Sequence, residues 1–463
     1  MSPLRPGWLC TVMISVWKKK QSPKRYLHFD SPLSIDKCWK KITDPKYVKS
    51  HAFYPFIHYE LKHVKYVQTQ AHTKVKQIKK RDIFYCSHLD RYVYAYYGFQ
   101  LNTCYDQKVK TLDIDNNCIA YRLNKGLNTV NYAYRALKFI YDSRRPCLIM
   151  VGDFTEFFDS LNHSYLKSKL QEVLGVERLE RDWYGIFKSI TQYCYIERED
   201  LLQISGLSLD QRKGLISESG RNKIFENGSD FRQFKNLHLK KNKNDYGIPQ
   251  GAPISAVLSN VYMLDFDLAM KRYVTNYQGQ YYRYSDDFII VIPLTNGDVF
   301  YQEQQRLSSY IQNEVNKVRN LKLHSNKCQF FLWDAHSTNK LKLRKQDGNK
   351  LLPGILQYLG FSFDGCLVKV RDKTITKYYY RAYSKVRGIK YQWGKGLKQG
   401  RSNLYRLYSL KGASSKNTPS KSSRRNGNFL SYVKIVKKTM RNLSFTEKII
   451  ERHYGRIKKR LLL

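Results

Sequence analysis

Residues 281–292, YYRYSDDFIIVI, decide the fold: two apolar runs enclose a turn that carries the adjacent carboxylates Asp286 and Asp287. The length of the runs and their aromatic and β-branched residues predict a two-stranded hairpin. Two acids at a hairpin tip are often only a solvated turn. Strands as apolar as these, however, are typical of a buried sheet, which would place the two carboxylates at the rim of a core. Repulsion between them there would require a cation.

A second apolar run also ends in a carboxylate. Residues 147–151, CLIMV, lie between Pro146 and Gly152, and Asp153 and Phe154 follow. The short length and these flanks favour a buried strand over a helix. Three carboxylates from two neighbouring strands would form an all-oxygen site suited to Mg²⁺. Two such ions can activate a 3′-hydroxyl and stabilise a leaving pyrophosphate during phosphoryl transfer.

The composition predicts a folded protein with a polyanionic partner. The 463 residues are 42% hydrophobic and 14% aromatic, which suits two or three domains with a sizeable core. Lys and Arg outnumber Asp and Glu by 82 to 38, and a net charge of +44 repels itself unless a polyanion neutralises it. Nucleic acid is favoured over an anionic membrane surface, because no run of 18 apolar residues occurs. We therefore expect no membrane partner.

Cysteine usage and the N-terminal region favour the cytoplasm. The nine cysteines are scattered without a CxxC pair, which argues against a disulfide framework and a zinc site and fits a reducing compartment. The apolar stretch 7–17 is followed, not preceded, by lysines 18–20. This order favours a buried strand or short helix over a secretory signal.

Five segments resemble, in order, the motifs of reverse transcriptases, particularly those of group II introns and retrons. They are DFTEFFD (153–159), IPQGAPIS (248–255), YSDD (284–287), HSNK (324–327) and YLGF (358–361). Each motif alone is weak to moderate evidence, but the probability that all five occur in the family order by chance is very small. The second motif departs from many relatives by reading Ile-Ser-Ala where they carry Ser-Pro, a change that touches no metal ligand. The resemblance covers roughly residues 80–370.

The resemblance implies an α+β right-hand polymerase, with fingers and an antiparallel palm sheet followed by a basic helical thumb and a C-terminal extension. We expect an N-terminal extension over 1–60, fingers over 61–145, a palm over 146–365 and the thumb with the C-terminal region over 366–463. Within the palm, residues 196–246 are charged and rich in Gly, Asn and Ser, which predicts a loop-dominated insertion.

The resemblance also implies a role for each motif residue. Asp153, Asp286 and Asp287 would hold two Mg²⁺ ions, with Phe154 beside them, and Lys327 would protonate the pyrophosphate or stabilise its charge. Phe158, five residues after Asp153, would exclude a 2′-hydroxyl and so select dNTPs. Taken alone, Phe158 would be a core aromatic and Lys327 a solvated surface charge.

The remaining expected contacts are with the nucleotide, the primer and the nucleic-acid backbone. Basic residues upstream of the first motif suit a triphosphate, Gln250 would contact the incoming nucleotide, and Gly251 would allow close backbone approach. The nucleotide-binding set is Lys80, Arg81, Arg122, Phe157, Phe158, Gln250 and Gly251; the primer grip is Leu359 and Gly360; the backbone contacts are Arg424 and Arg425.

The C-terminal region extends the nucleic-acid prediction. Residues 366–463 contain 27 Lys or Arg and 3 Asp or Glu, and they are rich in Tyr, which suits phosphate contacts and stacking. No second acidic constellation for RNase H and no His/Cys cluster for an endonuclease is evident. The design resembles the defence-associated reverse transcriptases of bacteria, which copy a structured noncoding RNA into cDNA during phage infection.

Several alternatives stay open at this point. A retron enzyme making branched RNA–DNA is the first alternative and an intron maturase the second, whereas an idle RNA-binding scaffold is disfavoured by the complete carboxylate set. An RNA-dependent RNA polymerase is disfavoured by Phe158 and by YSDD. The template, the product and the priming hydroxyl, including one from any of the 38 tyrosines, are not specified. A homo-oligomer is compatible with the sequence.

Overall fold

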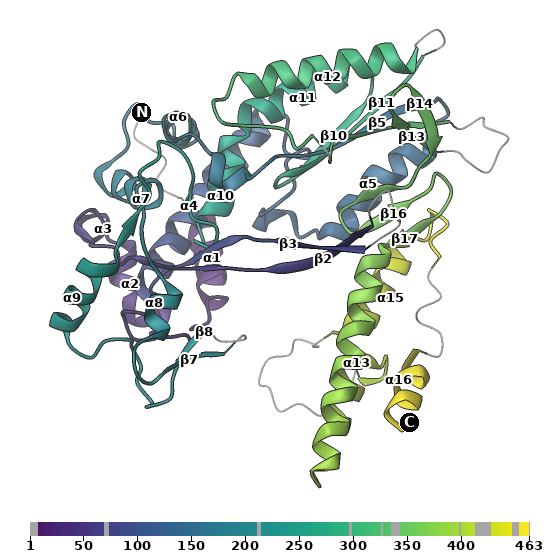
Figure 1. The fold of residues 1–463 in the computed structure, drawn as a ribbon. Coiled ribbons are helices and arrows are strands. Elements are labelled where there is room, and N and C mark those ends of the chain that lie inside the picture. The colour runs from purple at the N-terminus through teal and green to yellow at the C-terminus, as the bar shows by residue number, and fades with distance from the viewer. Residues whose placement is uncertain are drawn as a thin grey trace.

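The protein combines two main sheets with a column of C-terminal helices (Figure 1). This α+β architecture confirms the predicted fold class. The computed structural model describes residues 8–68, 74–210, 214–295, 299–325, 327–334, 343–397, 400–412, 427–446 and 453–462.

The larger sheet has six strands and is antiparallel throughout, in the order β10-β11-β5-β12-β13-β14. The predicted hairpin forms its β10–β11 edge, and the second apolar run is the neighbouring β5. Its strands are β10 (Gln280–Tyr284), β11 (Asp287–Pro293), β5 (Cys147–Asp153), β12 (Gln329–Trp333), β13 (Leu343–Asp347) and β14 (Lys350–Pro353).

Helices cover both faces of this sheet, which explains its uninterrupted apolar strands. Leu148, Met150 and Ile290 enter one core together with α4, α11 and α12, while Ile149 and Ile289 enter another with α5. Figure 1 shows α11 and α12 above the sheet and α5 below it. Because successive side chains of a strand point to opposite faces of the sheet, the residues on both faces must be apolar here. The helices are α4 (His88–Thr111), α5 (Thr129–Asp142), α11 (Leu264–Asn276) and α12 (Phe300–Asn316).

The smaller sheet has four strands in the order β4-β1-β6-β9. Strand β1 pairs antiparallel with β4 and parallel with β6. The sheet therefore draws strands from the ranges 1–60, 61–145 and 146–365, which the domain prediction had assigned to three different units. Its strands are β1 (Phe56–Glu60), β4 (Asp82–Tyr85), β6 (Cys194–Glu197) and β9 (Lys240–Lys241).

The prediction of a loop-dominated insertion over 196–246 is wrong for its described residues. Leu201, Leu215 and Ile224 from this segment are buried together with Leu27 and Phe29 from the N-terminal region. These contacts join residues far apart in the sequence, so local periodicity gave no sign of them. The segment contains α8 (Arg198–Leu202), β7 (Leu207–Asp210), β8 (Gly214–Ser217) and α9 (Gly228–His238).

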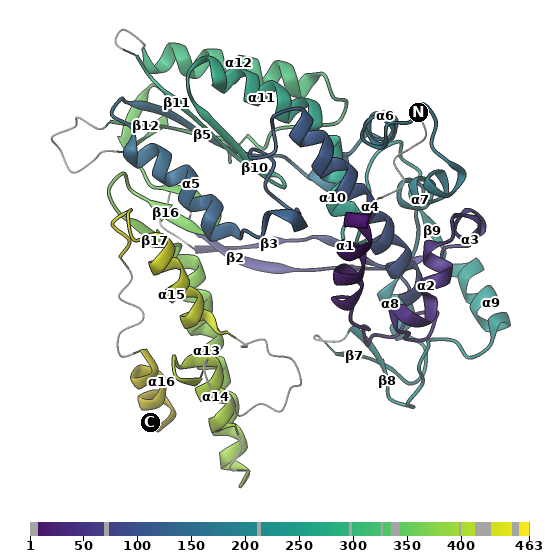
Figure 2. The ribbon, with the colours of Figure 1, turned by 180° about the vertical axis from the view of Figure 1, so that it is seen from behind.

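Helices and a ribbon complete the N-terminal half. The apolar stretch at 7–17 forms a helix from Trp8 onward, one of the two expected outcomes. A two-stranded ribbon, β2–β3, extends beyond the smaller sheet (Figure 2). The elements are α1 (Trp8–Lys19), α2 (Ile35–Thr43), α3 (Pro45–Ser50), β2 (His63–Gln68), β3 (Lys74–Lys79), η1 (Leu123–Lys125), η2 (Phe157–Ser160), α6 (His163–Leu174), α7 (Arg181–Thr191) and α10 (Ser255–Tyr262).

A three-stranded sheet leads into the C-terminal helices. In its order β15-β16-β17, residues Leu359 and Gly360 form the turn between the first two strands. Arg424 and Arg425 lie outside the described residues. Among the residues that are described, no helix combines the length and apolarity needed to cross a membrane. The elements are β15 (Leu356–Tyr358), β16 (Phe361–Phe363), β17 (Val368–Val370), α13 (Asp372–Gly394), α14 (Arg401–Tyr408), α15 (Phe429–Thr439) and α16 (His453–Leu462).

Candidate active site

The three predicted carboxylates lie at one end of the six-stranded sheet. Asp153, the last residue of β5, lies directly opposite Asp287, the first residue of β11, and Asp286 precedes it in the turn. The adjacent cross-strand pair is Gly152 with Phe288. A Cβ at Gly152 would lie 2.2 Å from the Phe288 ring, so glycine is required for this register. The register thus brings together two acids, Asp153 and Asp287, that are 134 residues apart in the sequence.

Several residues around the carboxylates hold left-handed backbone conformations that non-glycine residues rarely adopt. Ser285 has φ = 61°, Glu156 has φ = 45° and Leu359 has φ = 43°. Tyr121, whose hydroxyl donates to Ser285 Oγ at 3.0 Å, has φ = 60°. Such residues cost free energy and gather where tertiary contacts hold a functional geometry. Four of the eight non-glycine residues with positive φ among the described residues are thereby tied to the predicted site.

Lys327 occupies one oxygen of Asp153 and leaves the other without a partner. Its ammonium lies 2.5 Å from Asp153 Oδ2, whereas Asp153 Oδ1 is buried with no hydrogen bond. Among the described residues, no three Asp, Glu, His or Cys side chains converge closely enough to form a ready metal site. A buried acceptor without a partner is costly, and a cation held by Asp153, Asp286 and Asp287 would satisfy it. The donor chemistry therefore fits Mg²⁺.

Electrostatics within the carboxylate group are unfavourable without a cation. Asp287 is exposed at this end of the sheet, but partial desolvation of its carboxyl group raises its pKa to about 6, and the charges of Asp286 and Asp153 add to this. Lys327 and Arg371 oppose the shift in that pKa. A carboxyl whose pKa is raised first by desolvation and then by neighbouring carboxylates is typical of a site built to receive positive charge.

The first and second predicted motifs lie side by side. Phe158 is half-buried beside Phe157, with ring centroids 5.6 Å apart, and its carbonyl accepts from the Ile248 amide at 2.9 Å. The Gln250 carbonyl accepts from Phe84 of β4 at 2.9 Å. A Cβ at Gly251 would lie 2.3 Å from the Phe84 carbonyl oxygen, so only glycine allows this approach.

Two motif aromatics are buried. The rings of Phe154 and Phe157 are 2% and 4% exposed and pack against each other. Only the main chain of Phe154 could therefore face a metal. Phe157 supports Phe158 from the core, and Phe158 is the more accessible of the two.

The structure does not support Arg122 as a triphosphate ligand. Its guanidinium is fully buried, donates to the carboxylates of Asp106 and Asp115 at 2.6 Å each, and also bonds the Asp115 and Cys118 carbonyls. In the folded protein Arg122 forms structural ion pairs with Asp106 and Asp115. The position of Arg122 in the sequence could not show that these partners are present. Lys80 is exposed and pairs with Glu60 at 3.0 Å, and Arg81 is exposed where the ribbon joins β4.

The predicted primer-grip turn lies between the carboxylates and the C-terminal helices. Leu359 and Gly360 both have positive φ, as expected for a tight two-residue hairpin turn. The amide of Arg371 donates to the Gly360 carbonyl at 3.0 Å. Buried Tyr358 precedes the turn, and its hydroxyl has no hydrogen-bond partner among the described residues.

Sequence reasoning missed two arginines at this site. Arg371, directly before α13, contributes positive charge at Asp287, and Arg283 is completely buried in β10. A signal for Arg283 was present: an arginine within an otherwise apolar and aromatic strand needs a buried partner. Arg371 carries no comparable signal, because basic residues are frequent throughout this chain.

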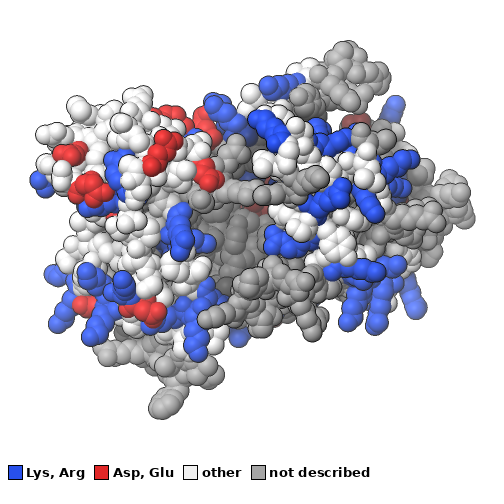
Figure 3. Space-filling view, turned by 90° about the horizontal axis from the view of Figure 1, so that it is seen from below, with Lys and Arg blue, Asp and Glu red and all other residues white. Residues whose placement is uncertain are grey.

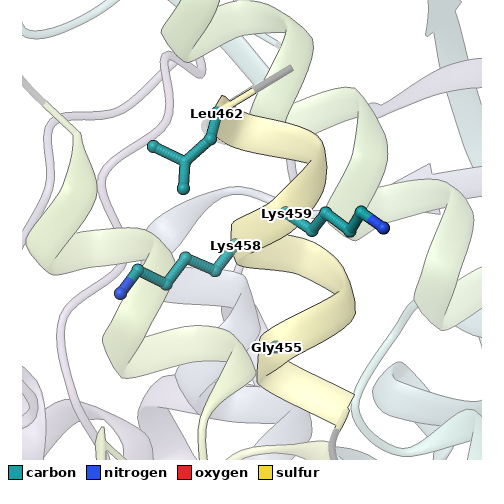
Figure 4. Close-up of a pocket in the computed structure, with 4 residues that line it drawn as sticks. All are labelled: Gly455, Lys458, Lys459 and Leu462. Atoms are coloured by element: carbon teal, nitrogen blue, oxygen red, sulfur yellow. The ribbon is translucent and has the colours of Figure 1, made fainter.

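The hollow along α16 is separate from the carboxylates. It measures about 380 Å³ and is lined by Gly455, Lys458, Lys459 and Leu462 (Figure 4). The two lysines point to opposite sides of the helix, and the lining contains no acid. It offers no ligand for a divalent cation.

One comparison with known proteins, that with protein-family models, agrees with the motif resemblance. Residues 76–363, more than half of the chain, match the family model described as reverse transcriptase (RNA-dependent DNA polymerase). No curated protein sequence matches the chain. Among solved structures, apo telomerase from Candida tropicalis, truncated from the C-terminal domain, is similar at 11% identity and a TM-score of 0.40, over 72% of this chain and 59% of that one. Telomerase from Candida albicans in complex with a fragment of telomeric RNA is similar at 13% identity and a TM-score of 0.37, over 92% of this chain and 61% of that one. The chain thus spans less than two thirds of these two telomerases.

Proposed function

Because the chain belongs to the reverse transcriptase family, we propose that it is an RNA-directed DNA polymerase that adds dNTPs to a primer on an RNA template. The observation that carries this proposal is the register that sets Asp153 opposite Asp287 and places Asp286 in the adjoining turn. Extension of a primed RNA by labelled dNTPs, abolished by EDTA and restored by Mg²⁺, is the test. A protein that bound the primed RNA but never extended it would refute the proposal.

The residues at the site divide the work of phosphoryl transfer. Asp153, Asp286 and Asp287 would hold two Mg²⁺ ions, which when bound activate the 3′-hydroxyl and stabilise the leaving pyrophosphate. Lys327, which pairs with Asp153, lies beside the same carboxylates and would neutralise the charge of the leaving pyrophosphate. Phe158, held from behind by the buried Phe157, would exclude the 2′-hydroxyl of a ribonucleotide.

The raised pKa of Asp287 predicts a pH-dependent metal requirement. Metal binding needs the ionised carboxylate, and a pKa of about 6 means that protons compete for it below that pH. At limiting Mg²⁺ we expect dNTP incorporation to fall as the pH drops from 7 to about 5.5, and excess Mg²⁺ should restore it. Initial rates over a grid of pH and Mg²⁺ measure this. If excess Mg²⁺ did not restore the dNTP incorporation lost at acidic pH, the assignment of Asp287 as a metal ligand would be contradicted.

We infer further that the template is a structured noncoding RNA, copied into cDNA in bacterial antiphage defence. Support comes from the net charge of +44 and from the resemblance to defence-associated enzymes. Sequencing the nucleic acid that copurifies with the protein separates the alternatives. A discrete RNA with its complementary DNA supports the inference, a branched RNA–DNA indicates a retron enzyme, and intron RNA indicates a maturase.

Helix α13 supports backbone binding by the C-terminal region. Lys377, Tyr380, Arg387 and Tyr391 follow one another at intervals of three, seven and four residues, which places them along one side of the helix, and all are exposed. Neither Lys377 nor Arg387 forms an ion pair with any described residue. Figure 3 shows basic side chains gathered on the face of the molecule seen from below, with few acidic ones in the right-hand part. Lysines and arginines interleaved with exposed tyrosines suit phosphates and bases.

Neutralising the α13 charges should reduce the salt dependence of RNA binding. Each phosphate contact contributes about 0.7 to 0.9 to the slope of log affinity against log salt, so Lys377→Gln with Arg387→Gln should flatten it by about 1.5 and weaken unrelated RNAs equally. The measurement is a salt titration of binding.

A matched control comes from the opposite end of the molecule. Lys37 and Lys40 on α2 are exposed and equally charged. Lys37→Gln with Lys40→Gln should leave the slope unchanged. Equal flattening by both pairs would mean that charge acts diffusely and that α13 makes no particular contact.

A further inference from the structure

One ion pair lies wholly inside the protein behind the YSDD turn. The side chains of Arg283 on β10 and Asp267 on α11 are both 0% exposed. Arg283 Nε donates to Asp267 Oδ1 at 2.7 Å, and its Nη2 donates to Oδ2 at 2.6 Å. The Tyr281 hydroxyl donates to Oδ1 at 2.7 Å, and Cys118 Sγ lies 2.9 Å from Oδ2. Both oxygens of Asp267 are therefore fully satisfied.

The third guanidinium nitrogen of Arg283 reaches the turn itself. Nη1 donates to the Ser285 carbonyl at 2.9 Å and to Asn260 Oδ1 at 3.2 Å. Ser285 is the buried residue whose φ of 61° directs the chain from β10 into Asp286. A left-handed serine persists only where surrounding contacts hold it. The Arg283 hydrogen bond is such a contact.

The same turn is held from a second side by the segment 117–121. The Arg283 amide donates to the Asn117 carbonyl at 2.9 Å, and the Ile119 amide donates to the Arg283 carbonyl at 3.0 Å. Tyr121 then donates from its hydroxyl to Ser285 Oγ at 3.0 Å. These hydrogen bonds fix the main chain of Arg283 and therefore the position from which its side chain reaches the turn.

We propose that Arg283 is a positioning residue: neutralised by Asp267, its guanidinium fixes the Ser285 carbonyl and so the direction in which Asp286 presents its carboxylate to metal. This inference rests on the proposed polymerase function. Arginine suits the task because its planar fork binds a carboxylate with two nitrogens while the third remains for the carbonyl. A buried ion pair alone says little about stability, because apolar pairs of similar volume often serve as well.

The test separates positioning from stability. The double variant Arg283→Met, Asp267→Leu leaves no buried charge unpaired, so the fold should be retained. Its Tm should be lowered, because the Tyr281 hydroxyl and the Ser285 carbonyl lose their buried hydrogen-bond partners. The variant lacks the donor to Ser285, and we expect Mn²⁺ binding, measured by EPR on the protein alone, to weaken on the order of tenfold or more. Primer extension should need correspondingly more Mg²⁺, with RNA affinity unchanged. Arg283→Lys keeps the charge but not the fork and should show the same metal defect.

Tyr97→Phe supplies the matched control. It removes a buried 2.7 Å hydrogen bond to a carboxylate, that of Asp182, in a helix pair away from the turn. It should lower Tm without changing Mn²⁺ affinity. Wild-type Mn²⁺ affinity in both Arg283 variants, or loss of the fold in both, would overturn the positioning role. A wild-type protein without primer extension would instead refute the proposed function.

Discussion

Changing Asp286 and Asp287 together to Ala is expected to abolish dNTP incorporation while leaving RNA binding nearly intact. The two carboxylates would hold the metals, whose charge stabilisation is worth several kcal/mol, or a loss of about 10³-fold or more in rate. On the proposed function, RNA affinity would depend on the basic surface, which the substitutions do not alter. Single-turnover primer extension and a binding titration on the same RNA measure both effects.

Two acids remote from the turn control for charge. Glu218, directly after β8, and Asp230, in the first turn of α9, are both exposed, and Glu218→Ala with Asp230→Ala changes the net charge by the same amount. This variant should extend primers at the wild-type rate. Full activity in the Asp286, Asp287 double variant would rule out the metal site.

Replacing Phe158 with Val should admit ribonucleotides. The ring is half-buried against Phe157, and shortening it opens space without disturbing the buried ring behind it. Steric exclusion by a few carbon atoms changes the kcat/KM ratio of two substrates by about 10- to 200-fold. The ratio of kcat/KM for dNTP over rNTP should therefore fall by about this factor in the variant. Competition between dCTP and CTP in primer extension measures it.

Phe158→Tyr is the corresponding control, because it retains the ring and should retain the preference for dNTPs. The assignment of Phe158 would fail if the wild type already used both nucleotides equally, or if Val left the ratio unchanged.

The sequence alone determined the elements whose signal is local. Apolar runs that end in acids predicted β5 and the β10–β11 hairpin. A strand that is covered on both faces of its sheet needs apolar side chains at odd and even positions alike. Motif order then predicted which residues would gather, and the structure brings Asp153, Asp287 and Lys327 together. Their roles remain predictions.

Only the tertiary structure decided which charges were available and which segments paired. Arg122 was a reasonable phosphate ligand by residue type, yet Asp106 and Asp115 bury it. The segment 196–246 joins a sheet with β1 through partners more than a hundred residues away. Arg283 of strand β10 can donate to the YSDD turn from inside the protein because Asp267 of helix α11 neutralises it. In each case the deciding contact is non-local: composition and periodicity report what a residue can bond, and the packed chain determines which partner it meets.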